Sequence, residues 1–192
     1  MAPPCDLVAS REQISERVAL LAGEIGRAYR DLNPVFVGVL PGSILFLADL
    51  VRAVGVPADV DFVSLRPYSV EGRVALTLDS AIPLAGRDVI LVHDVVDTGL
   101  TLRTLQRMIA LQRPASIENC TFVDKEHRRI VDVPIRYRAY TAGDELVLGY
   151  GIGWRGRFAN AAGLWGVTDV GALVDDPAAF DAEIYGSKPR TQ

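Results

Sequence analysis

The chain has 192 residues, which fits one α/β domain of ordinary size and leaves little room for a second domain. Hydrophobic residues make up 49% and charged residues 23%, proportions that are typical of a globular protein and not of a disordered one. The net charge of −4 and the pI near 5.2 argue against a nucleic-acid-binding protein that relies on broad neutralisation of phosphates.

The ends and the cysteines give no sign of secretion, membrane insertion or a metal framework. The first residues lack a basic stretch followed by an apolar one, and no apolar run reaches the roughly 18 residues that span a bilayer. Cys120 lies in an apolar run and is expected to be a buried thiol, whereas Cys5 lies in an N-terminal segment that we expect to be mobile. Two histidines and two scattered cysteines do not predict a zinc site. We therefore expect a soluble protein of the cytoplasm.

The predicted elements alternate along most of the chain. Ser10 and Gln13 form a capping-box pattern, and the apolar spacing that follows predicts an amphipathic helix from about residue 11 to 30. Strands then alternate with helices until about residue 125, an order that is typical of βαβ units and a parallel sheet. The predicted strands are residues 35–40, 60–65, 74–78, 88–95, 118–124, 135–140, 145–150 and 164–167, and the further predicted helices are 44–54 and 100–111. We interpret the chain as a single domain, residues 1–192, with mobile ends at 1–9 and 186–192.

The stretch VILVHDVVDTGLTL, residues 89–102, begins as a uniformly apolar strand and ends in polar groups. Ligands of open parallel sheets bind beyond the carboxyl ends of the strands, where His93 and Asp94 fall. Two polar groups at the end of a buried strand are costly unless a partner satisfies them. The end of this strand is therefore a candidate binding site.

The residues that follow predict an anion site at the turn into the next helix. Backbone N–H groups of such a turn and the positive end of the helix attract an anion, and the hydroxyls of Thr98 and Thr101 add donors. Gly99 allows a ligand to approach the backbone closely. A phosphate monoester would fit here. The alternative for Asp97 taken alone is that it merely caps the helix, because Asp is common at that position.

This stretch resembles the phosphoribosyl-pyrophosphate signature of type I phosphoribosyltransferases, a strand with two acids, two apolar residues and Asp-[Thr/Ser]-Gly. Further segments, from about Ser10 to Val167, are similar in order and spacing to the hypoxanthine-guanine branch of that family. These segments are ERVALLAGEI, PVFVGVLPGSILFLADLVR, VDFVSLRPY, TFVDKEHRR and DELVLGYGIGW. The resemblance implies the type I α/β fold, a twisted and mostly parallel sheet flanked by helices, with a small hood formed by terminal segments.

The resemblance also implies which residues bind the donor, phosphoribosyl pyrophosphate. The ribose hydroxyls and a magnesium ion would meet His93 and Asp94, with Asp94 as the metal ligand. Asp97 would be the general acid/base. The 5′-phosphate would lie on the turn, and the pyrophosphate on the turn after the second strand and on nearby arginines. The donor-binding residues so implied are His93, Asp94, Asp97, Thr98, Gly99, Leu100, Thr101, Leu40, Pro41 and Gly42. Arg155 and Arg157 are added because they lie near enough in the sequence to substitute for a family arginine that Ala159 replaces.

On the acceptor side, the resemblance implies a pocket for a nucleobase. Lys125 would contact the purine 6-oxo group, and the backbone of Val147 would read the base edge. Val95 and Leu146 would pack on the faces of the base. Apart from the resemblance, Trp154 is a candidate for packing over the pocket because it follows Gly153, although a tryptophan is more often a core or interface residue.

The chain departs from the family pattern around the pyrophosphate and the acceptor. The changed positions, with the residue usual in the family, are His93 (an acid), Pro41 (a residue with a free N–H), Leu146 (an aromatic), Gly153 (Asp) and Ala159 (Arg). The loop between Tyr68 and Val74 is also shorter than usual, and Pro67 replaces a serine. Taken singly, each change is ordinary variation. Together, these changes leave the assignment of the donor, phosphoribosyl pyrophosphate, better supported than the assignment of the acceptor.

Three hypotheses follow from these residues. The first is a magnesium-dependent enzyme that transfers 5-phosphoribose to hypoxanthine or guanine. The second keeps the reaction but uses a non-purine acceptor. The third is a non-catalytic regulator that senses nucleotides and binds nucleic acid, which the acidic pI and the retained Asp97 disfavour. We interpret the cluster Lys125, Arg128 and Arg129 as a solvated face. By analogy with the family, a homodimer or homotetramer is expected, with no membrane or nucleic-acid partner.

Overall fold

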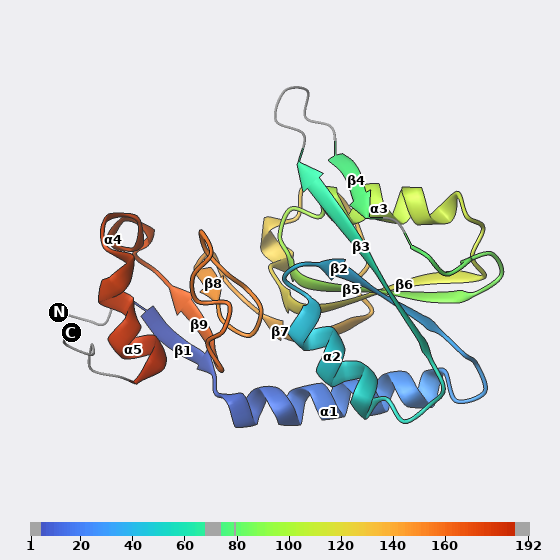
Figure 1. The fold of residues 1–192 in the computed structure, drawn as a ribbon, viewed down its shortest axis with the longest axis horizontal. Helices are drawn as coiled ribbons and strands as arrows, with labels where there is room; N and C mark the ends of the chain where they lie inside the picture. The colour runs from blue at the N-terminus through green and yellow to red at the C-terminus, as the bar shows by residue number, and fades with distance from the viewer. Residues whose placement is uncertain (1–4, 68–73, 79, 187–192) are drawn as a thin grey trace.

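Two β-sheets organise the part of the chain that this computed structural model describes, residues 5–67, 74–78 and 80–186. The larger sheet has the strand order β4-β3-β2-β5-β6-β7, and the smaller one has the order β1-β9-β8. Figure 1 shows the smaller sheet on the left and the larger on the right, with α1 running from one toward the other. The elements are β1 (Cys5–Ala9), α1 (Arg11–Ala28), β2 (Val35–Leu40), α2 (Ile44–Ala53), β3 (Asp59–Pro67), β4 (Val74–Leu78), β5 (Asp88–Val96), α3 (Leu100–Ala110), β6 (Ser116–Asp124), η1 (Glu126–Arg128), β7 (Tyr137–Thr141), β8 (Leu146–Leu148), β9 (Leu164–Val167), α4 (Val170–Asp175), η2 (Pro177–Phe180) and α5 (Asp181–Tyr185).

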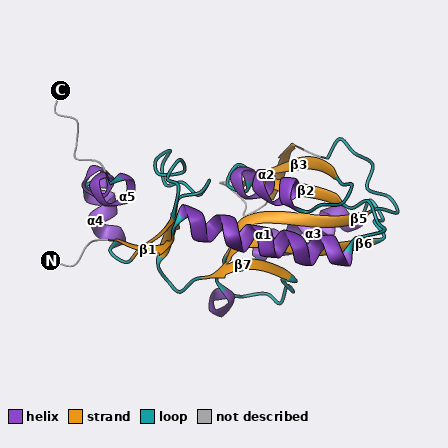
Figure 2. Ribbon diagram, turned by 90° about the horizontal axis from the view of Figure 1, so that it is seen from below, coloured by secondary structure: helices purple, strands orange, loops and turns teal. Residues whose placement is uncertain are grey.

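The larger sheet confirms the predicted parallel architecture. Strands β3, β2, β5, β6 and β7 pair in parallel, and β4 adds an antiparallel edge to β3. Helices α1 and α2 pack on one face through a core that includes Phe36, Ile90 and Phe122. Helix α3 packs on the other face against Val89 and Leu91 (Figure 2). Apolar side chains on both faces explain why β5 reads as a continuous hydrophobic run.

Helix α1 begins where the sequence predicts. The amide of Ser10 donates to Gln13 Oε1 at 2.8 Å, and the Gln13 amide donates to Ser10 Oγ at 3.3 Å, which completes the capping box. The apolar residues at helical spacing, Ile14, Val18, Leu21 and Ile25, are all buried. The helix ends at Ala28, two residues before the predicted end.

The smaller sheet and the C-terminal helices α4 and α5 form the hood, which we define as residues 5–9 and 146–186. The expectation of a mobile N-terminus is wrong for residues 5–9, because they form strand β1 and pair with β9. Cys5 is 1% exposed and packs in the hood core with Trp165 and Phe180. Pairing with β9, which lies more than 150 residues later in the chain, stabilises this first strand. Local sequence gives little sign of such a pairing.

Other predictions differ in detail. Strand β7 begins at Tyr137, two residues later than predicted, and β8 is confined to Leu146–Leu148. The short loop expected between Tyr68 and Val74 falls on residues 68–73, outside the described part of the chain. Within the described ranges, no helix is long and apolar enough to cross a bilayer.

Candidate active site

At the turn between β5 and α3, the N-terminus of helix α3 has no side-chain cap. The N-cap of α3 is Gly99, whose φ of 82° lies in the left-handed region, and no side chain caps the helix. The first helical hydrogen bond runs from the Arg103 amide to the Gly99 carbonyl at 2.9 Å, so the preceding amides have no intrahelical acceptor. The alternative in which Asp97 caps the helix is therefore wrong.

The amides of this turn are free to bind a ligand. Among the described residues, no acceptor meets the N–H groups of Thr98 and Gly99, and the Leu100 amide has only a 3.5 Å contact with Thr98 Oγ1. A Cβ on Gly99 would lie 2.9 Å from Val133 Cγ2, so a side chain at this position would collide with the segment behind the turn. Open amides at the positive end of a helix form an anion-binding concavity.

Asp94, at the end of β5, lies against the turn between β2 and α2. A Cβ on Gly42 would come within 1.7 Å of Asp94 Oδ2, so a side chain at this position would force the Asp94 carboxylate to move. The carboxylate accepts the Val95 amide at 2.8 Å, and burial raises the pKa of Asp94. In the same turn the Leu40–Pro41 peptide bond is cis. The structure thus brings together two predicted donor-binding segments that are about 50 residues apart.

His93 lies apart from Asp94. Side chains alternate along a strand, so His93 shares the face of β5 that carries Leu91 and packs toward α3, while Asp94 faces Gly42. The imidazole is 4% exposed, and its Nε2 has no hydrogen-bond partner in the described residues. Burial and the nearby positive charge of Arg129 lower the pKa of His93 to about 4. The structure therefore holds a neutral histidine beneath the turn and does not bring it beside Asp94.

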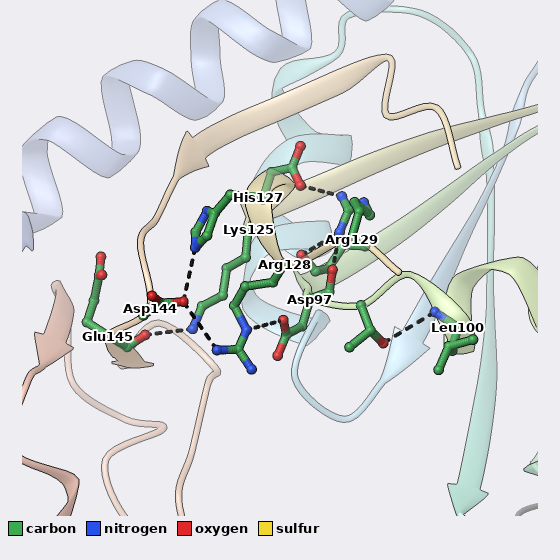
Figure 3. A network of polar contacts seen from close by, with 11 residues as sticks. Asp97, Leu100, Lys125, His127, Arg128, Arg129, Asp144 and Glu145 are labelled. Atoms are coloured by element: carbon green, nitrogen blue, oxygen red, sulfur yellow. Dashed lines mark hydrogen bonds and ion pairs between the residues drawn. The ribbon is translucent and has the colours of Figure 1, made fainter. Parts of the chain in front are cut away.

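Asp97 belongs to a polar network that spans three segments (Figure 3). Arg128 Nε donates to Asp97 Oδ1 at 2.6 Å, and Arg128 Nη1 reaches Asp144 Oδ1 at 3.3 Å. The hydrogen bond to Asp97 is the main reason that the pKa of Arg128 is raised. His127 Nε2 also contacts Asp144 Oδ1, at 3.1 Å. The candidate acid/base is thus tied to the loop between β7 and β8.

Lys125 and Arg129 correct the expectation of a solvated face. Lys125 is 6% exposed, and its Nζ donates to the Glu145 carbonyl at 2.6 Å. The side chain of Arg129 is 14% exposed and pairs with Asp124, which is almost fully buried. One sequence signal could have indicated this pair. Asp124 ends a buried strand, and a buried carboxylate requires a cation, which Arg129 supplies five residues later.

The remaining predicted acceptor residues lie at the junction of sheet and hood. Val95 packs against the core beneath α1 and α2, and Val147 is buried in the same core. Leu146 and Trp154 are partly buried against the hood core. The hood loop reaches the β2–α2 turn, because a Cβ on Gly151 would lie 2.5 Å from the carbonyl oxygen of Gly42.

Both arginines that were expected near the pyrophosphate are engaged within the hood. Arg157 Nη2 pairs with both carboxylate oxygens of Asp181 at 2.8 Å, and the Arg155 guanidinium lies 4.5 Å from the centroid of Trp154. At Gly153, a Cβ would meet the Arg157 carbonyl at 3.1 Å, so the hood backbone is closely packed at this departure from the family.

Comparisons with known proteins agree with this geometry. The family model described as phosphoribosyl transferase domain matches residues 8–141. A hypoxanthine phosphoribosyltransferase of Salmonella typhimurium is 36% identical over 161 residues, covering 81% of this chain and 90% of the relative. A hypoxanthine-guanine phosphoribosyltransferase of Streptococcus pneumoniae is 31% identical over 158 residues, covering 80% and 88%. The crystal structure of a hypoxanthine-guanine phosphoribosyltransferase from Bacillus anthracis superposes with a TM-score of 0.82 at 34% identity, covering 85% of this chain and 98% of that one.

Proposed function

We propose that this chain, which belongs to the phosphoribosyltransferase family, transfers 5-phosphoribose from phosphoribosyl pyrophosphate to a 6-oxopurine such as hypoxanthine or guanine. The products would be a nucleoside monophosphate and pyrophosphate. The names of the relatives and the retained Asp97 support this reaction.

The open amides between β5 and α3 carry the proposal. A 5′-phosphate offers anionic oxygens that the N–H groups of Thr98, Gly99 and the first turn of α3 could bind without displacing any protein acceptor among the described residues. The hydroxyls of Thr98 and Thr101 would add donors. Because these contacts come mostly from the backbone, they depend little on side-chain identity.

In the reaction, the bond between C1′ and the pyrophosphate oxygen breaks as a ring nitrogen of the base bonds to C1′. Positive charge builds on the ribose, so nearby carboxylates stabilise the transition state more than the ground state. The proton on the incoming nitrogen would pass to the Asp97 carboxylate. Arg128 holds Asp97 through Oδ1, which leaves Oδ2 to receive that proton.

The residues at the end of β5 fit a magnesium ion held mainly by the donor. Asp94 forms no ion pair with any described residue although it is partly buried, so a divalent cation would supply a missing positive charge. No group of three or more metal-binding side chains gathers in the described ranges. That is consistent with Mg²⁺, which commonly uses one or two carboxylates together with substrate phosphates and waters. When bound, the ion would screen the charge of the departing pyrophosphate.

The acceptor would enter between the sheet and the hood. Lys125 uses one N–H on the Glu145 carbonyl, so two ammonium donors remain for the oxygen of a 6-oxo group. A 6-amino group cannot accept these hydrogen bonds, so the site would favour 6-oxopurines over adenine. The backbone of Val147 would meet the base edge, and Val95 and Leu146 would offer apolar faces.

The test is turnover with phosphoribosyl pyrophosphate, Mg²⁺ and a panel of bases, with nucleotide products separated by chromatography. We expect inosine and guanosine monophosphates and little product from adenine. Turnover of a non-purine heterocycle with none of hypoxanthine or guanine would replace the acceptor while keeping the donor. No product with any acceptor would instead favour a non-catalytic, nucleotide-binding protein.

A further inference from the structure

Three consecutive carbonyl groups at the β5–α3 turn accept hydrogen bonds from one segment, residues 129–131, and the first of them, that of Val96, also accepts the Lys125 amide at 3.0 Å. Arg129 Nη1 donates to the carbonyl of Val96 at 2.9 Å and also to that of Asp97. The Ile130 amide donates to the Thr98 carbonyl at 3.0 Å. The carbonyls of residues 96, 97 and 98 therefore all point toward this segment.

Because each peptide unit is planar, these contacts also fix the direction of the amides on the opposite side of the turn. In a planar trans peptide unit the C=O and the following N–H point in opposite directions. Fixing the carbonyls of Val96, Asp97 and Thr98 thus directs the amides of Asp97, Thr98 and Gly99 away from Arg129. Those are the first amides of the anion-binding concavity, and Thr98 and Gly99 have no acceptor among the described residues.

Arg129 is itself anchored in the protein. Its Nη2 pairs with Asp124 Oδ1, and the Asp124 side chain is only 2% exposed at the end of β6. Removing one partner of a buried ion pair leaves an uncompensated charge, so the Arg129–Asp124 pair is costly to break.

We infer that Arg129, anchored by Asp124, is the positioning residue for the phosphate group of the donor. It acts through peptide groups that it orients and not through contact with the reacting atoms. This inference rests on the proposed function, because it names the residue that prepares the donor half of that site.

The chain provides a matched control. Arg138 Nη1 also pairs with Asp124, at 3.3 Å to Oδ2, but it touches none of the turn carbonyls. We would compare Arg129→Met with Arg138→Met by measuring the affinity for phosphoribosyl pyrophosphate by calorimetry, the KM for each substrate, and the melting temperature. Arg129→Met should weaken donor binding by about tenfold to a hundredfold and leave the KM for hypoxanthine nearly unchanged. Arg138→Met should lower the melting temperature without weakening donor binding.

A role in folding alone predicts a different pattern, in which both variants lose active protein while the affinity for the donor stays constant. Equal donor affinity in Arg129→Met, Arg138→Met and the parent chain would overturn the inference while leaving the proposed function standing. If the parent chain binds no donor at all, the proposed function fails first. Should Arg129→Met not fold, Arg129→Lys retains the charge but not the planar fork, and a donor-selective loss of several-fold is then expected.

Discussion

The turn after β5 and the hood are held together by different kinds of contact. At the turn, backbone carbonyls accept from the segment 129–131 and backbone amides face the site. Near the hood, side chains bridge distant segments: Lys125 donates to the Glu145 carbonyl, and Arg128 joins Asp97 to Asp144. Within the hood, Arg157 pairs with Asp181. A site made of backbone groups tolerates side-chain change, and a site made of side chains does not.

Three of the departures from the family lie in the hood, and Pro41 removes one backbone N–H from the turn after β2 on the donor side. Leu146, Gly153 and Ala159 all lie in the hood, where contacts depend on side chains. On the donor side, His93 is buried beneath the turn and does not line the concavity. The comparison therefore predicts that donor recognition is retained more strictly than acceptor recognition, and the following variants test it in order of expected effect.

Asp97→Asn should separate chemistry from binding on the donor side. The amide cannot accept the proton from the base, so kcat should fall by about 10²- to 10⁴-fold. The affinity for phosphoribosyl pyrophosphate should change little, because the turn binds through backbone amides. Single-turnover kinetics and calorimetry check the two quantities, and a comparable loss in both would show that the Asp97 side chain holds the donor.

His93→Leu should alter the dependence of stability on pH. The unfolded chain protonates His93 below its ordinary pKa of about 6.5, whereas the folded chain does so only near pH 4, so low pH favours the unfolded state. This histidine should therefore remove about 2 kcal/mol of the free energy of unfolding at pH 5 relative to pH 7 or above. Urea unfolding of both chains at the two pH values isolates the contribution, and parallel pH dependences would contradict it.

Gly99→Ala tests whether the turn requires glycine because a Cβ has no space there, in addition to the left-handed φ. A left-handed φ costs a non-glycine residue about 1–2 kcal/mol, so the free energy of unfolding should fall. Gly55→Ala is the control, because its φ of 71° is similar but a Cβ there meets nothing within 4 Å. Both variants should lose stability, and Gly99→Ala alone should raise the KM for the donor. Equal donor KM values would argue against the turn as the phosphate site.

Leu146→Tyr should produce the smallest change, confined to the acceptor. An aromatic ring at this position can stack on a purine, which is worth about 1–3 kcal/mol per base in comparable sites, and partial exposure favours the low end of that range. We expect the KM for hypoxanthine to fall several-fold while the donor KM stays constant. A lower KM for both substrates would show that the two halves of the site are coupled.

How much of this molecule could be predicted depended on whether the interactions were local. The capping box of α1 and the apolar run of β5 depend only on neighbouring residues, and the structure confirms both. Strand β1 was missed because its partner β9 is remote in the sequence. Arg129 was expected on a solvated face because it stands among other charged residues, although the position of Asp124 at the end of a predicted buried strand indicated that this carboxylate needs a cation.

The crystal structure of the chain with bound phosphoribosyl pyrophosphate tests the central claim most directly. We expect the 5′-phosphate oxygens to lie within hydrogen-bond distance of the amides of residues 98–101, with the Asp97 and Thr98 carbonyls still directed toward residues 129–131. A phosphate bound elsewhere, or amides of this turn paired with protein carbonyls in the complex, would contradict the account.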